Sequence, residues 1–326
     1  MKPVTRAEAS IRHENRLVQY SVVIAVFNEQ ENMLELCRRL TAVMQSLGAT
    51  YEIILVDDGS TDRSFPMMKA LHEQDNRIKA LKLSRNFGHH VALTAGLDLA
   101  NAEAVILMDA DLQDQPEEIP KLLEKFNEGY DVVYGIRKNR KESLRRRIAA
   151  SVFTAIMNRM TGSGHFATGG VFRVMSGQVR DELQQCRETS RFIIGLVSWL
   201  GFNQTGVEVE HGARYAGETK YNLWRLIKLL INTVTSFSYL PLQLASYLGL
   251  LTALVSVSWG AYIIYRWIFL DVPVAGFTSI IVAILFLGAV QLIVLGVIGE
   301  YVGRVYTESQ ARPLYVVKEI LDQSPR

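Results

Sequence analysis

The sequence predicts an α/β fold with a doubly wound, mostly parallel sheet, followed by two helices that cross a membrane as a hairpin. Three observations support this prediction. Apolar, β-branched runs alternate with helical patterns from Ser21 to Tyr134, as they do in strand–helix–strand units. Polar clusters follow these runs where the strands end, and two long segments near the C-terminus contain no charged residue.

The strand predictions depend on short apolar runs of the kind found in strands that are buried on both faces. The expected strands are Ser21–Phe27, Tyr51–Val56, Ile78–Leu83, Ala104–Met108 and Asp131–Tyr134. The helix predictions depend on apolar residues at helical spacing between these runs. The expected helices are Met33–Leu47, Ser64–His72, Val91–Leu99 and a helix that Pro116 opens.

Polar side chains directly follow four of these strands. They are Asn28 with Glu29, Asp57 with Asp58, Arg85 with Asn86, and Asp109 with Asp111. Parallel strands end at the same edge of a sheet, and doubly wound folds bind their ligands beyond that edge. We therefore expect one site that collects these groups.

Asp109 and Asp111 are separated by a single alanine. A hard cation such as Mg²⁺ or Mn²⁺ binds one or two carboxylates and takes further oxygens from phosphates. Gln113 is close enough in sequence to complete such a metal shell, and the forked cation of Arg85 suits a phosphate. Acidic pairs follow many strands, so this pair alone does not indicate a site. The polar clusters at the ends of the other strands, together with this pair, indicate a nucleotide-diphosphate site.

Two uncharged segments predict the membrane hairpin. Pro241–Tyr265 and Val272–Gly299 each exceed the roughly 20 residues that cross a bilayer core. Basic residues flank the pair on its outer ends, namely Arg225, Lys228, Arg304 and Arg312. By the positive-inside rule both ends are cytoplasmic and the tight turn between the helices lies outside.

Two further segments have the pattern of helices that lie on a membrane surface, with packing against the α/β domain as the alternative for each. Residues at about 141–160 begin in a basic cluster and continue as an apolar helical face, which suits an anionic membrane surface. The cluster contains Arg137, Lys138, Arg140, Lys141, Arg145, Arg146 and Arg147. Residues 221–240 place two basic residues on an otherwise apolar helix.

Composition excludes several other classes of protein. The net charge of +2 over 326 residues gives no indication of nucleic-acid binding. Cys37 and Cys186 are far apart and lack the spacing of a zinc site or a disulfide framework. The leader has no apolar core, so it is not a signal peptide and the following domain should stay in the cytoplasm. The expected division is a leader at 1–20, an α/β catalytic domain at 21–220, an interfacial helix at 221–240, the hairpin at 241–299 and a cytoplasmic tail at 300–326.

Several motifs together resemble one enzyme family. They are SVVIAVFNEQEN, EIILVDDGSTD, LSRNFGHHVALTAGLD, ILMDADLQDQPEEIP, YDVVYGIR, RYAGETKYN and LGVIGEYVGRVYTESQARPLYVV. The chain resembles the family-two glycosyltransferases of the GT-A fold, and among them the polyprenyl-phosphate branch. Within that branch it is most similar to bactoprenol glucosyltransferases, and it also resembles undecaprenyl-phosphate formamido-arabinose transferases and dolichol-phosphate mannose synthases.

The resemblance implies a role for each matching position. Together with Arg85, the expected nucleotide-binding residues are Val26, Asn28, Glu29, Asp57 and Asp58. Asp109, Asp111 and Gln113 are expected to hold a divalent metal, Mg²⁺ or Mn²⁺. The expected catalytic residues are Asp109, Asp111, Arg214 and Lys220. The residues expected at the acceptor phosphate and the membrane surface are Arg137, Arg145, Arg146, Arg147, Arg214 and Lys220.

The implied reaction is the inverting transfer of a sugar, with glucose favoured, from a UDP-sugar to undecaprenyl phosphate. It would take place at the cytoplasmic face of the inner, or plasma, membrane. The resemblance also suggests a multi-pass protein that forms a homo-oligomer, namely a tetramer. Formamido-arabinose transfer is an alternative. A processive polysaccharide synthase is another, although such enzymes usually have more spans and a QxxRW-like motif. An inactive homologue that acts as a membrane scaffold is the alternative from another class.

Val171 departs from the family pattern. Many relatives have an acidic residue there, often assigned as the catalytic base, and its loss leaves two interpretations: no carboxylate is needed, or activity is lost or altered. We favour the first, because a phosphate monoester has a second pKa near ~6 and is mostly an oxyanion at pH 7. Two roles remain for His89 and His90: they contact the diphosphate, or they belong to an ordinary polar loop.

Overall fold

The computed structural model describes residues 18–137, 170–212, 240–270 and 276–322. The interfacial segment predicted around 141–160 lies outside these ranges, and so does the one predicted at 221–240, except for Leu240, which begins a helix. Arg145, Arg146, Arg147, Arg214 and Lys220 also lie outside them. The chain divides into two compact units. One contains residues 1–222 and 313–326, and the other contains residues 223–312.

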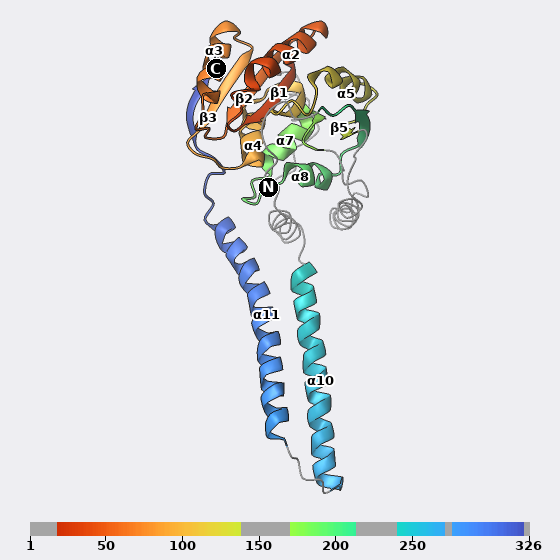
Figure 1. Cartoon of the computed structure of the whole chain (residues 1–326). Coiled ribbons are helices and arrows are strands. Elements are labelled where there is room, and N and C mark those ends of the chain that lie inside the picture. The colour runs from red at the N-terminus through yellow and green to blue at the C-terminus, as the bar shows by residue number, and fades with distance from the viewer. Residues whose placement is uncertain (1–17, 138–169, 213–239, 271–275, 323–326) are drawn as a thin grey trace. The chain divides into compact units, whose positions relative to one another are not determined.

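The first unit contains an eight-stranded sheet in the order β7-β5-β6-β4-β1-β2-β3-β8 (Figure 1). Its strands are β1 (Val18–Val26), β2 (Tyr51–Asp57), β3 (Ile78–Leu83), β4 (Ala102–Asp109), β5 (Val132–Arg137), β6 (Arg173–Ser176), β7 (Gln204–Val209) and β8 (Val317–Leu321). The neighbours β3-β2-β1-β4 are parallel, as is the pair β5 and β7. β6 runs antiparallel to β4 and β5, and β8 runs antiparallel to β3. The sheet is therefore mixed but mostly parallel.

The order of the strands creates a switch point between β1 and β4. From β1 the chain passes to β2 and β3 on one side, and then crosses back to add β4 on the other side of β1. Crossover helices leave the ends of β1 and β4 in opposite directions at such a point, which opens a crevice beyond the carboxyl ends of the two strands.

Helices cover both faces of the sheet. They are α2 (Met33–Ser46), α3 (Ser64–Gln74), α4 (His89–Leu99), a 3₁₀ turn η1 (Pro116–Glu118), α5 (Ile119–Phe126), α7 (Gly177–Gln185) and α8 (Ile193–Trp199). Apolar residues of α2, α3 and α5 form one core cluster with one face of β1 and β2. α4 packs on the opposite face, where a Cβ at Gly96 would lie 2.3 Å from Cγ1 of Val23. Glycine is required there because the helix approaches the strand so closely.

The predicted fold class is confirmed, with differences at the end of the chain. The five expected strands and the helices between them are present, and α4 begins two residues earlier than expected, at His89. Strands β6, β7 and β8 were not expected from the sequence. The tail predicted at 300–326 instead contains the end of α11 and strand β8. β8 is short and half exposed, so its apolar pattern is too weak to mark it before the sheet edge is known.

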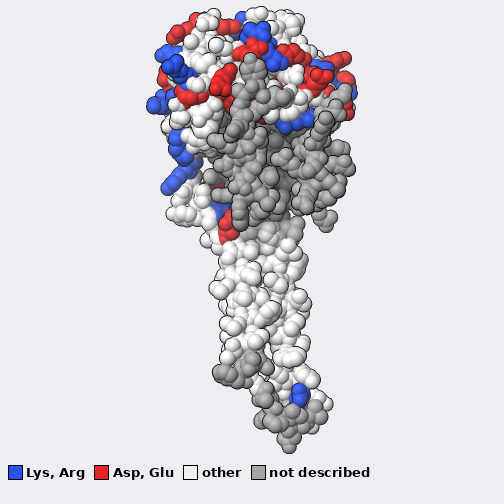
Figure 2. Space-filling view, in the orientation of Figure 1, with Lys and Arg blue, Asp and Glu red and all other residues white. Residues whose placement is uncertain are grey.

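The second unit contains the two long helices α10 (Leu240–Leu270) and α11 (Phe277–Ser309). Both are long and apolar enough to cross a membrane, and they contact each other. Their large apolar side chains are exposed, among them Leu254 and Phe286. Figure 2 shows almost no charged residue along most of this unit. On α11, Glu300 and Arg304, four residues apart, form an ion pair at 2.8 Å.

Candidate active site

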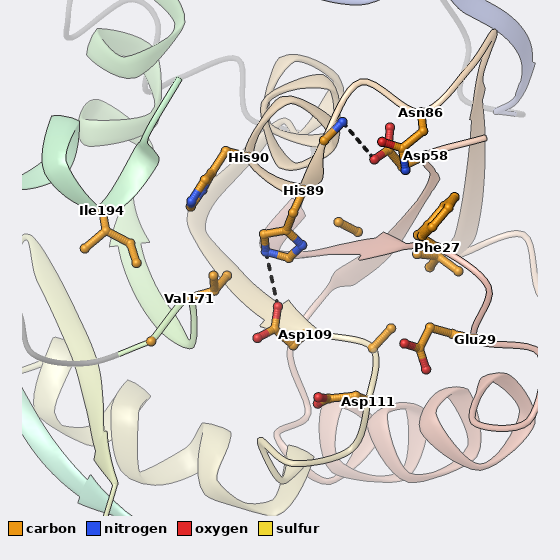
Figure 3. Close-up of a pocket in the computed structure, with 15 residues that line it drawn as sticks. Phe27, Glu29, Asp58, Asn86, His89, His90, Asp109, Asp111, Val171 and Ile194 are labelled. Atoms are coloured by element: carbon orange, nitrogen blue, oxygen red, sulfur yellow. Dashed lines mark hydrogen bonds and ion pairs between the residues drawn. The ribbon is translucent and has the colours of Figure 1, made fainter. Parts of the chain in front are cut away.

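A pocket of about 520 Å³ lies at the switch point, at the carboxyl ends of β1 and β4 (Figure 3). It collects side chains from several loops that are distant in sequence. The lining residues are Ala25, Val26, Phe27, Glu29, Asp58, Asn86, Gly88, His89, His90, Asp109, Ala110, Asp111, Gly170, Val171 and Ile194. Of the residues predicted from the sequence, Val26, Glu29, Asp58, Asp109 and Asp111 therefore meet at one site.

Asn28 lies beside this lining and organises the neighbouring loop. Its backbone has φ +56, in the left-handed region that asparagine tolerates better than most residues. Its side-chain oxygen accepts a hydrogen bond from the Thr61 N–H at 2.9 Å, and its own N–H donates to Oγ of Ser60 at 3.0 Å. Asn28 thus joins the end of β1 to the loop that follows β2.

Asp57 and Asp58 have different surroundings at the end of β2. Asp58 uses both oxygens to accept hydrogen bonds from the N–H groups of Phe87, at 2.7 Å, and Gly88, at 3.0 Å. Burial raises the pKa of Asp58 despite these two bonds. Asp57 is fully buried and accepts from the Ser60 N–H at 3.0 Å, while its Oδ2 has no hydrogen-bond partner and lies 3.7 Å from Nζ of Lys82. Asp57 does not line the pocket, whereas Asp58 does.

Arg85 and Gln113 do not line the pocket. The guanidinium of Arg85 lies over the ring of Phe87, 4.1 Å from its centroid, and donates to the backbone oxygen of Asn86. The neighbouring Asn86 lines the pocket in its place. Gln113 uses its backbone N–H to donate to Oδ1 of Asp111 at 3.1 Å.

The loop after β4 presents two carboxylates to the pocket. Asp109 and Asp111 both line it, and between them and Gln113 the buried Leu112 has φ +60, a conformation that strains a residue with a branched side chain. Among the described residues, no three His, Cys, Asp or Glu side chains form a cluster for a metal ion. Two carboxylates nevertheless fit a hard cation that completes its shell with diphosphate oxygens and water.

Asp114 is a buried acid that sequence reasoning missed. Its side chain is 3% exposed, and its Oδ1 lies 3.5 Å from Nδ1 of His211 and 3.9 Å from Nη2 of Arg137. Burial, followed by the charge of Asp109, raises the pKa of Asp114 to about 7. Its position after the acidic pair was visible in the sequence, but its contact with His211 was not. His211 follows β7 and pairs with Asp114 through an isolated backbone bridge.

Arg137 reaches the edge of the pocket. It is the last residue of β5, and its guanidinium packs on Gly170, where a Cβ would lie 3.1 Å from Nη2. Gly170 lines the pocket and accepts a hydrogen bond from Nη2 of the buried Arg173 at 2.9 Å. Val171 also lines the pocket and is only 8% exposed, so the pocket has an apolar side chain at this position.

Comparison with known proteins identifies the family. Residues 21–183 match the model of glycosyl transferase family 2, and residues 240–305 match the model of the GtrB C-terminal hairpin. The chain belongs to glycosyl transferase family 2. It is therefore a glycosyltransferase, and every residue that lines the pocket except Ile194 lies within the part of the chain that matches the family model.

Relatives in this glycosyl transferase family match nearly the whole chain. An uncharacterized glycosyltransferase of Synechocystis is 44% identical over 93% of this chain and 96% of its own length. The glycosyltransferase YkcC of Bacillus subtilis is 42% identical over 94% of this chain and 95% of its own length. An undecaprenyl-phosphate 4-deoxy-4-formamido-L-arabinose transferase of Salmonella paratyphi A is 40% identical over 92% and 93%. Among solved structures, the chain is similar to glucosyl-3-phosphoglycerate synthase of Mycobacterium tuberculosis, with 16% identity, 73% and 84% coverage and a TM-score of 0.49.

Proposed function

We propose that the chain transfers a sugar from a UDP-sugar to a polyprenyl phosphate, with undecaprenyl phosphate as the acceptor. The observation that carries this proposal is the pocket at the switch point, where Asp109 and Asp111 meet nucleotide-binding candidates from β1 and β2. The apolar hairpin and the similarity to a named undecaprenyl-phosphate transferase support a lipid acceptor. A bacterial inner membrane, with the α/β unit in the cytoplasm, is the corresponding location.

Different residues in and around the pocket are assigned to the nucleotide, the metal and the acceptor phosphate. Asp58, Val26 and Glu29 line the pocket at the end proposed to receive uridine. Asp57 does not line it but directly precedes Asp58 at the end of β2. Asp109 and Asp111 would hold a divalent cation, which when bound neutralises charge on the departing diphosphate. Arg137, at the edge of the pocket, supplies positive charge for the acceptor phosphate, and Arg214 and Lys220 are proposed to do the same from outside the described residues.

Val171 fits an acceptor that needs no base. A sugar hydroxyl must lose its proton in order to attack, whereas a phosphate monoester is mostly deprotonated at pH 7. Val171→Asp should therefore change turnover by less than the roughly 100-fold that a positioned general base supplies. Initial rates with undecaprenyl phosphate measure this change. A rise from no activity to full turnover would contradict it.

Two sugars are candidates. Resemblance to bactoprenol glucosyltransferases favours glucose, and the 40% identity to formamido-arabinose transferases favours 4-deoxy-4-formamido-L-arabinose. The purified full-length protein is incubated with undecaprenyl phosphate, Mn²⁺ and each UDP-sugar of a panel, and the lipid products are weighed by mass spectrometry. A lipid-linked sugar and an equal amount of UDP are expected with one donor. UDP release that does not require the lipid phosphate, or no lipid product with any donor, would contradict the proposal.

A further inference from the structure

His89 is a pocket residue whose role the sequence leaves open. It is the first residue of α4 and reaches the carboxylate of Asp109 from a different strand–helix unit. Its Nε2 lies 3.2 Å from Oδ1 of Asp109 (Figure 3). The two residues are 20 positions apart in sequence, so only the fold brings them together.

The backbone before His89 is held in place by Asp58. Both carboxylate oxygens of Asp58 accept hydrogen bonds from backbone N–H groups, those of Phe87 and Gly88. Gly88 has φ +104, which only glycine adopts without strain. The direction in which the chain enters α4, and therefore the position of His89, is fixed from the end of β2.

The ring of His89 is also supported from its side. It makes an edge-to-face contact with the ring of His90, with centroids 5.5 Å apart. The His90 ring in turn meets the ring of Phe192 edge-to-face, at 5.2 Å. Three rings from α4 and the segment before α8 thus form a row that ends at Asp109, which limits the rotamers open to His89.

We propose that His89 is a positioning residue that orients the Asp109 carboxylate for a divalent cation. Its Nε2 lies 3.2 Å from Oδ1 of Asp109, close enough to hold the orientation in which the carboxylate faces the pocket. Carboxylates that bind metals are commonly held in this way by an outer partner, and loss of that partner typically weakens metal binding about 10- to 100-fold. The inference rests on the proposed function, because it takes Asp109 as a metal ligand.

The experiment measures Mn²⁺ affinity directly, without turnover. Full-length protein in detergent is titrated with Mn²⁺ at saturating UDP, and free Mn²⁺ is read from its electron paramagnetic resonance signal. His89→Ala should raise the Kd for Mn²⁺ about 10- to 100-fold. His89→Gln, which keeps an N–H donor, should recover most of the affinity. Glu73→Gln, on the exposed surface of α3, is the remote control.

A second measurement separates positioning from direct contact with the diphosphate. UDP affinity in the presence of EDTA should stay within about twofold of wild type in His89→Ala, since positioning acts through the metal. The inference would be overturned if His89→Ala lost as much UDP affinity in EDTA as it lost Mn²⁺ affinity, or if its Kd for Mn²⁺ were unchanged. Wild-type protein that binds no Mn²⁺ would overturn the proposed metal role as well. If His89→Ala loses its thermal unfolding transition, His89→Leu provides the same comparison with His89→Gln.

Discussion

Asp111 carries the charge on which the proposed metal role depends most directly. It lines the pocket, and its Oδ1 fixes the turn after β4 by accepting from the Gln113 N–H. Asp111→Asn keeps an oxygen for that turn but removes the negative charge. We expect turnover to fall at least about 100-fold while the melting temperature stays near that of wild type. Lipid-linked sugar formation and a thermal melt measure the two effects, and wild-type product yield by this variant in metal-depleted buffer would refute the metal assignment.

His90 should make stability depend on pH. Burial, assisted by the charges of His89, Arg173 and Arg191, lowers the pKa of His90 to about 3. An unfolded histidine titrates near ~6.5, so below that pH the unfolded chain binds more protons than the folded one. The contribution of the neutral His90 to the free energy of unfolding is therefore complete above pH ~6.5. It is lost progressively as the pH falls, by up to about 1.4 kcal/mol at pH 5.5.

Replacement of His90 tests this dependence. His90→Gln removes the titrating group, so its melting temperature should fall less between pH 7.5 and pH 5.5 than that of wild type. Comparing the two proteins at both values cancels the contribution of every other titrating residue. An equal fall in both proteins would show that His90 is protonated as easily in the folded state as in the unfolded chain.

At the scale of elements, β8 ties the end of the chain to the sheet. It pairs with β3, and the preceding Tyr315 donates a hydrogen bond to Oδ2 of Asp98 at 2.7 Å. Asp98, near the end of α4, also accepts hydrogen bonds from Nη1 and Nη2 of Arg187. The contact therefore links the C-terminal segment to the helix whose first residue is His89.

Tyr315→Phe should destabilise the α/β unit by about 1 kcal/mol, since it removes a partly buried hydrogen bond to a carboxylate. For a unit of this size the melting temperature should fall by roughly 2–4 °C. Tyr130→Phe is the matched control, because that tyrosine is near the surface and away from β8. Equal melting temperatures for Tyr315→Phe and wild type would mean that the bond contributes nothing to stability.

At the scale of the whole molecule, the path of the chain restricts how it can cross a membrane. The chain leaves the α/β unit before α10 and re-enters it at β8, in the same sheet as β1. One folded unit occupies one side of a bilayer, so the segment between must cross an even number of times. Two helices of 31 and 33 residues satisfy this condition as one hairpin.

Cysteine labelling in intact cells tests this topology. Asp271→Cys, between the two helices, should react with a membrane-impermeant maleimide added from outside, because the basic flanks favour a cytoplasmic location for both outer ends. Lys318→Cys, exposed on β8, should react only after the cells are permeabilised. Labelling of Lys318→Cys in intact cells would contradict the topology. The native Cys37 is buried and Cys186 lies in the same unit as β8, so the unmodified protein gives the background.

The sequence alone determined the alternation of strands and helices, the polar residues at the strand ends and the uncharged helix pair. Those features are local, since a buried strand or a membrane helix is recorded in consecutive side chains. Val26, Glu29, Asp58, Asp109 and Asp111 could be assigned to one site because parallel strands share an edge.

Only the tertiary structure decided which groups support that site. The burial of Asp114, the contact of His89 with Asp109 and the addition of β8 to the sheet each join segments that are far apart in the chain. A side chain's own sequence neighbours do not determine whether a distant loop covers it, so no local pattern predicts these contacts. The order of the strands brings the loops after β1 and β4 together at the switch point, and the same sheet takes β8 at its edge beside β3.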